Sequence, residues 1–171
     1  MVECGVGLSG CGRSLGYVQE PWAQARLRAG DERELEALLR EMLHAGVRGM
    51  IPAFRFLLAD ETEQALIVAL YDDVARLLGP DHRGFSLRQV LQRLSFEQAH
   101  PLAARWVASF LLDVEAGLHE YWGLFDYLQE AGFSDLASRV AHAAVESTGE
   151  QELRAAGREW LLELEDGIER R

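Results

Sequence analysis

The fold of this chain is decided by the stretch MIPAFRFLLADETEQALIVALYDDVA, which spans residues 50–75. Its apolar residues recur at intervals of three and four, the period of an amphipathic helix, and they form two runs separated by polar residues. The pattern begins at Asp31 and continues toward the C-terminus, and no long stretch alternates at every second residue as a half-buried strand does. The sequence therefore predicts an all-α protein.

The two apolar runs recur along the chain as an internal repeat. Three copies align without gaps at offsets of about 36 and 34 residues. The aligned positions of the first run are Ile51, Leu87 and Tyr121, then Phe54, Val90 and Leu124, then Leu58, Leu94 and Leu128. Those of the second run are Leu66, Leu102 and Leu136, then Leu70, Trp106 and Val140, then Val74, Phe110 and Ala144. A two-helix unit of about 35 residues cannot bury both of its faces alone, so the period predicts a stack of helical hairpins with a continuous core.

The first copy resembles a HEAT repeat. Pro52 lies in its first half, Asp60 lies in the turn, and its second half begins with the small and apolar run ALIVAL at residues 65–70. The segments HPLAAR (100–105) and LASR (136–139) are similar to the start of that family's second helix. The resemblance covers about residues 50–148 and implies a short α-solenoid of about three hairpins, although tetratricopeptide-like hairpins would share the same apolar columns.

Helices outside the repeats complete a single helical domain over residues 31–171. A helix is predicted over about 32–46 with Asp31 as its N-cap, and a last helix over about 150–168, both of which would cap the stack. Asp60 and Glu63 predict a capping box for a helix near 61–78, and Ser134 begins another helix. A closed helical bundle is the alternative architecture.

The first thirty residues have a different character. They are rich in glycine and lack a sustained apolar period, so we expect a flexible N-terminal segment over residues 1–30. Gly5 to Gly10 match G-x-G-x-x-G, but too few residues precede them for the strand that a dinucleotide site requires. Cys4 and Cys11 are too few for a four-cysteine zinc site, and we expect free thiols in a reducing cytoplasm.

The net charge of the chain limits the kinds of molecule that it is expected to bind. The 171 residues include 17 basic and 28 acidic ones, a net charge of -11, of which about -8 falls in residues 101–171. An acidic surface repels nucleic acid and anionic lipid and favours a basic protein surface. No apolar run reaches the roughly 18–20 residues of a membrane span, so we expect a soluble, cytoplasmic protein. The absence of both lysine and asparagine indicates GC-rich, bacterial coding.

The clearest enzymatic candidate is a carboxylate and histidine metal site. Glu41 with His44, and Glu97 with His100, both match E-x-x-H, the spacing that di-iron helical bundles use. Glu63 or Glu115 would supply further ligands. Composition alone gives roughly one such match, and Pro101 predicts that Glu97 and His100 lie in a turn rather than within a helix. A metal-binding, ferritin-like oxidoreductase is thus the alternative function.

The leading hypothesis is a protein-interaction module without catalytic activity. The chain contains neither a nucleophile elbow nor a P-loop, and the HEAT-like resemblance implies an adaptor, scaffold or inhibitory binder that uses the groove of the repeat stack. The exposed positions predicted on the second helix of each repeat are Asp72, Arg76, Arg105, Ser109, Asp113, Arg139, His142 and Glu146. A third hypothesis is a small acidic inhibitor whose surface mimics an anionic ligand.

Overall fold

The computed structural model of this protein describes residues 30–60, 62–78, 82–113, 115–148 and 151–169. Within these ranges all regular structure is helical, without a strand, so the predicted all-α class is confirmed. The N-terminal features, including the glycine-rich segment, Cys4 and Cys11, lie outside the described residues.

The chain divides into two compact units, Met1–Glu61 and Thr62–Arg171. The described part of the first unit is a helical hairpin of α2 (Glu32–His44) and α3 (Val47–Leu58). The Asp31 carboxylate accepts a hydrogen bond from the Glu34 amide at 2.9 Å, which confirms the predicted N-cap. Gly46 turns the chain with a φ of 72°, a conformation that favours glycine.

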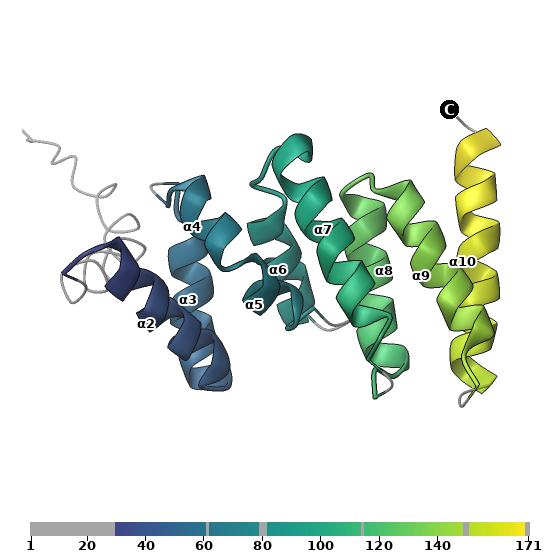
Figure 1. Ribbon diagram of the computed structural model, residues 1–171, viewed down its shortest axis with the longest axis horizontal. Coiled ribbons are helices and arrows are strands. Elements are labelled where there is room, and N and C mark those ends of the chain that lie inside the picture. Colours follow the sequence, from purple (N-terminus) through teal and green to yellow (C-terminus); the bar gives the residue numbers. More distant parts are fainter. Residues whose placement is uncertain (1–29, 61, 79–81, 114, 149–150, 170–171) are drawn as a thin grey trace, which may run out of the picture. The chain divides into compact units, whose positions relative to one another are not determined.

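The second unit contains the other described helices. They are α4 (Gln64–Ala69), α5 (Tyr71–Ala75), α6 (His82–Leu91), α7 (Phe96–Phe110), α8 (Leu118–Glu130), α9 (Ser134–Glu146) and α10 (Gln151–Glu169). Helix α7 packs against α4, α5 and α9, and α9 packs in turn against α8 and α10. In the second unit, α5, α7 and α9 therefore pack in series. Helices α6 and α8 lie behind this series in the view of Figure 1.

The helix predicted near 61–78 is wrong in detail. The segment is broken at Leu70 into α4 and α5, and α4 begins at Gln64 with Glu63 as its N-cap, so Asp60 is not the N-cap residue that the sequence predicted. The side chains of Leu70 and Tyr71 are both fully buried. The break allows these adjacent residues to enter the core together, which the helical period alone does not predict.

The turn predicted at His100 is also wrong. Pro101 lies inside α7, and His100 belongs to the same helix. Pro101 is close to the N-terminus of α7, where the helix loses one backbone hydrogen bond instead of ending. The amide of Ser95 donates to the Gln98 side chain at 3.1 Å, which stabilises the start of this helix.

Most of the predicted apolar columns lie in the core. Leu87, Val90 and Leu128 are fully buried, whereas Ile51 is 48% exposed. At the C-terminal end, Trp160 of α10 is buried and stacks on Phe125 of α8 with ring centroids 4.6 Å apart. Trp160 therefore packs the last helix, α10, against α8.

Polar side chains join α6 to α8 at the edge of this core. The buried Arg88 guanidinium lies 3.2 Å from the Glu130 carboxylate and 3.7 Å from that of Asp126. Burial raises the pKa of Asp126, while the Arg88 charge lowers it. The two helices are thus linked by charge.

Candidate functional site

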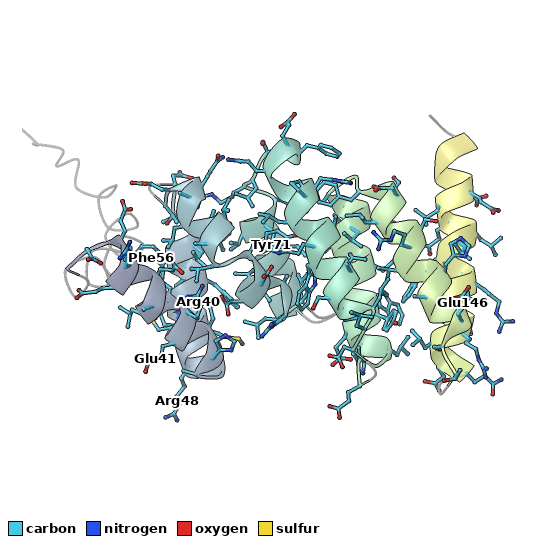
Figure 2. All side chains as sticks on the ribbon, in the orientation of Figure 1. Arg40, Glu41, Arg48, Phe56, Tyr71 and Glu146 are labelled. Atoms are coloured by element: carbon cyan, nitrogen blue, oxygen red, sulfur yellow. The ribbon has the colours of Figure 1, made fainter. Side chains whose placement is uncertain are left out.

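The predicted interaction residues lie on or directly after α5, α7 and α9. Seven of them are exposed and Asp72 is half-buried. Spacings of four residues, as between Arg105 and Ser109 or between His142 and Glu146, place side chains on one side of a helix. Figure 2 labels Glu146 on α9. We call these eight residues the polar strip: Asp72, Arg76, Arg105, Ser109, Asp113, Arg139, His142 and Glu146.

One ion pair in the polar strip joins neighbouring helices. Arg105 of α7 donates from Nη2 to both carboxylate oxygens of Asp72 of α5, at 3.0 Å each. Both side chains are substantially exposed, so the pair contributes no more than about 1 kcal/mol to stability. Its structural effect is to fix the position of two charges on this face.

Other residues of the polar strip form no ion pair among the described residues. Among the described residues, Ser109, Arg139, His142 and Glu146 make no side-chain hydrogen bond or ion pair. In the sequence alignment of the apolar runs, Arg139 corresponds to Arg105, and Ala108 corresponds to Asp72. The Arg139 guanidinium is therefore available to an acceptor from another molecule.

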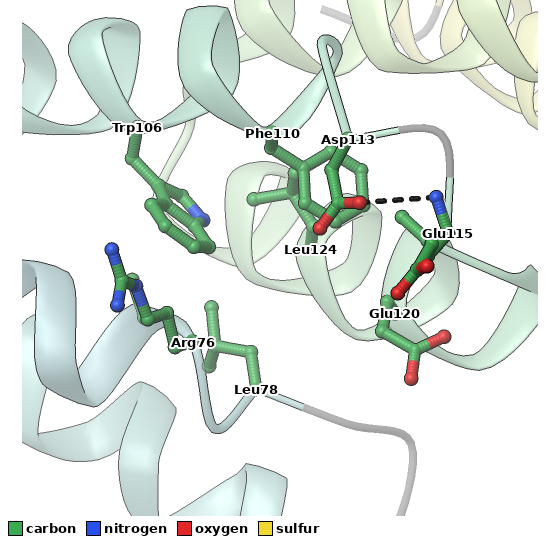
Figure 3. Close-up of a pocket in the computed structure, with 10 residues that line it drawn as sticks. Arg76, Leu78, Trp106, Phe110, Asp113, Glu115, Glu120 and Leu124 are labelled. Atoms are coloured by element: carbon green, nitrogen blue, oxygen red, sulfur yellow. Dashed lines mark hydrogen bonds between the residues drawn. The ribbon is translucent and has the colours of Figure 1, made fainter.

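A hollow adjoins the polar strip where α5, α7 and α8 meet. Its volume is about 190 Å³. Arg76 and Asp113 of the polar strip belong to its wall. Figure 3 shows Arg76 beside Trp106 at one end, and Asp113, Glu115 and Glu120 at the other. The lining residues are Ala75, Arg76, Leu78, Trp106, Phe110, Asp113, Glu115, Ala116, Glu120 and Leu124.

The hollow has opposite charges at its two ends. The Arg76 guanidinium carbon lies 5.9 Å from the centroid of the Trp106 ring, within the range of a cation–π contact. At the other end, an Asp113 carboxylate oxygen accepts a hydrogen bond from the Glu115 amide at 3.0 Å. Burial raises the pKa of nearby Tyr121, and the Asp113 charge raises it further. With three carboxylates and one guanidinium in its wall, the hollow is negative overall.

Sequence reasoning missed the hollow itself. Trp106 and Phe110 were expected only as core residues, and Glu115 was considered only as a metal ligand. Phe110 is buried, but Trp106 is partly exposed and contributes to the wall. The available signal is the run DVEAGLHE, residues 113–120, which places Asp113 and Glu115 in the link between α7 and α8 and Glu120 in the first turn of α8.

The residues of the alternative metal site are divided between the two compact units. Glu41 and His44 are exposed on α2 in the first compact unit, and Figure 2 shows Glu41 pointing away from its helix. Glu97 and His100 lie on α7, in the second unit. Across the described ranges, no three side chains of histidine, cysteine, aspartate or glutamate gather as metal ligands would.

His100 has a different partner. Its Nε2 atom lies 3.1 and 3.2 Å from the two carboxylate oxygens of Asp135 on α9. Its ring stacks on Phe96 and meets the edge of Phe133. Slight burial raises the pKa of Asp135, but the hydrogen bond and charge of His100 outweigh it, so that the pKa is lowered. This group links α7 to α9.

No helix in the described ranges has the length and apolar character of a membrane span. No family model matches the chain, and neither a curated protein nor a solved structure is significantly similar to it. Function is therefore inferred from the chain's own residues.

Proposed function

We propose that this protein is a non-enzymatic interaction module that binds another protein through the polar strip, on a stack of HEAT-like helical hairpins. Its role is that of an adaptor, scaffold or inhibitory binder. The observation that carries the proposal is the position of these polar residues on or directly after α5, α7 and α9, helices that pack in series, together with a hollow that two of them line.

The chemistry of this face favours recognition by charge pattern. The Asp72–Arg105 pair presents fixed charges, and Arg139, His142 and Glu146 present groups with unused hydrogen-bonding capacity among the described residues. Complementary charges accelerate and orient association, while aromatic side chains in hollows supply much of the binding energy. In the hollow beside the polar strip, this aromatic side chain is Trp106.

Site-specific photo-cross-linking tests the proposal. A benzophenone side chain is placed at Ser109 of α7 or at His142 of α9, and the protein is irradiated in its native lysate. The matched controls are Gln89 of α6 and Gln129 of α8, which are equally exposed on other helices. We expect one cross-linked protein, identified by mass spectrometry, from both strip positions and not from the controls. Equal cross-linking from all four positions would contradict the proposed face.

Charge reversal then measures the contribution of the polar strip. We expect Asp72→Lys with Glu146→Lys to weaken capture of the cross-linked partner while the circular dichroism spectrum is unchanged. Asp72→Lys also places a positive charge beside Arg105, whereas Glu146 has no such neighbour among the described residues, so the two single variants separate these effects. Unchanged capture by the double variant would exclude this face.

A further inference from the structure

The floor of the hollow is apolar and fits a hydrocarbon chain. Leu78, Phe110 and Leu124 contribute apolar side chains, and the Trp106 ring forms one wall. The volume of about 190 Å³ is below the roughly 300–1,000 Å³ of sites for drug-sized molecules. A hollow of this size holds one long side chain.

The charges at one end select the head group of that side chain. Asp113, Glu115 and Glu120 all belong to the wall, and none of them forms an ion pair among the described residues. The Asp113 charge is already felt by the neighbouring hydroxyl of Tyr121, whose pKa it raises in addition to burial. Binding of an apolar group would remove water from these carboxylates without replacing its hydrogen bonds, which is unfavourable.

We infer that the hollow seats an arginine or lysine side chain of the partner protein, with the aliphatic stem on Trp106 and Phe110 and the cationic head group beside Asp113, Glu115 and Glu120. The inference rests on the proposed function, whose partner it specifies as a protein with an exposed basic residue. The chain's net charge of -11 attracts such a partner as a whole.

Arg76 restricts how the side chain enters. Its guanidinium lies over the Trp106 ring, at the end opposite the three carboxylates, and it repels a second cation there. The head group therefore occupies the carboxylate end. An anionic side chain would bind unfavourably, because three carboxylates repel it and only Arg76 attracts it.

The probes are two capped tripeptides, acetyl-Gly-Arg-Gly-amide and its citrulline counterpart. Citrulline keeps the shape of arginine without its charge. The readout is the indole Nε1–H resonance of Trp106 in the full-length protein, assigned by its loss in Trp106→Phe. We expect the arginine peptide to shift this resonance in a saturable manner, and the citrulline peptide to bind about tenfold more weakly. The resonances of the other tryptophans serve as internal references.

Neutralising variants locate the response. Glu115→Gln with Glu120→Gln should weaken the arginine peptide by about tenfold. The matched control, Glu152→Gln with Glu159→Gln, removes the same charge from exposed positions of α10 and should leave binding unchanged. Equal shifts with arginine and citrulline, or equal binding by the two double variants, would overturn the inference.

The two proposals fail separately. If cross-links form only from Ser109 and His142 but the peptides are not distinguished, the interaction face stands and the assignment of the hollow falls. If the peptides are distinguished but cross-links form equally from Gln89 and Gln129, the hollow binds a basic side chain and the polar strip is not the partner's face.

Discussion

Two buried tyrosines make a contact that no local pattern contains. The Tyr71 and Tyr127 hydroxyls lie 2.9 Å apart, and one donates a hydrogen bond to the other between α5 and α8. Their side chains are 0% and 1% exposed, so each hydroxyl satisfies a partner that water cannot reach. The residues are 56 positions apart in the sequence. Helical periodicity predicts that each tyrosine lies on the apolar face of its helix, but not that the two side chains contact each other.

We predict that this pair makes the protein sensitive to alkali. Burial raises the pKa of Tyr127 from 10.0 to about 12, although the hydrogen bond with Tyr71 lowers it, and burial also raises the pKa of Tyr71. The unfolded phenols lose their protons near pH 10 while the folded ones keep them. Stability is therefore full below pH 10 and falls as the pH rises, by about 2–3 kcal/mol at pH 12 for Tyr127 alone.

Urea unfolding between pH 8 and 11.5 measures this effect, with those pH values set by the ordinary tyrosine pKa of about 10. The double variant Tyr71→Phe with Tyr127→Phe should lose less stability over the same interval, because neither buried phenol remains. An equally steep decline in the double variant would assign the alkaline sensitivity to other groups.

Gly132 shows a residue whose structure could be predicted from its neighbours. It follows α8 with a φ of 76°, its amide donates to the Gln129 carbonyl at 3.0 Å, and the Phe133 amide donates to the Leu128 carbonyl at 2.8 Å. This is the Schellman pattern of a helix C-terminus, in which glycine is preferred.

We predict that Gly132→Ala destabilises the protein by about 1–2 kcal/mol through backbone strain. A Cβ atom at this position meets nothing within 4 Å, so a steric clash does not contribute. Gly132→Asn should cost less, because asparagine tolerates the left-handed conformation. Urea unfolding of both variants checks the order, and an alanine variant as stable as the wild type would refute it.

At the scale of elements, α9 and α10 pack closely through small residues. A Cβ atom at Gly157 of α10 would lie 2.8 Å from the Ala141 carbonyl oxygen and 2.9 Å from the Ala144 Cβ atom. The neighbouring atoms include backbone, which cannot rotate away. The close approach of these two helices therefore depends on glycine.

We predict that glycine is unfavourable for stability at position 155 of α10 but favourable at position 157. Alanine is ordinarily the better helix former, so Ala155→Gly at an exposed position should cost about 1 kcal/mol. Gly157→Ala should instead destabilise by about 1–3 kcal/mol, because α10 must move away from α9. Thermal unfolding of the two variants gives the comparison. A stabilised Gly157→Ala variant would show that the helices adjust without cost.

Helix ends could be predicted where local signals set them, and not where the core sets them. Asp31 caps α2 as expected, because its carboxylate bonds to an amide three residues away. The break at Leu70 depends on the burial of Leu70 and Tyr71 against other helices, which the local sequence does not encode. Pro101 likewise acts as a helix breaker in isolation, yet it is accommodated inside α7.

For the whole molecule, the exposed residues of the polar strip were easier to predict than the hollow. Exposure follows from the helical period, because positions opposite an apolar stripe face solvent. The hollow requires three helices, α5, α7 and α8, and combines Trp106 with acids from the link between α7 and α8 and from the first turn of α8. Such a site depends on tertiary placement, so the sequence predicted its residues only as core or as isolated acids.

The last prediction concerns how the whole charge of -11 acts on partner binding. At 0.1 M salt the Debye length is about 10 Å. Added salt therefore first weakens the attraction between a diffuse acidic surface and the partner, while partly enclosed charges and apolar contacts persist. With the cross-linked partner in hand, we expect its affinity to fall by about threefold to tenfold between roughly 0.05 and 0.5 M sodium chloride, as measured by calorimetry. Glu120→Gln should reduce both the affinity and its salt dependence, whereas Glu159→Gln on α10 should change neither. If the affinity instead falls by more than about a hundredfold over this range of salt, and by the same factor in both variants, the acidic surface as a whole mimics an anionic ligand.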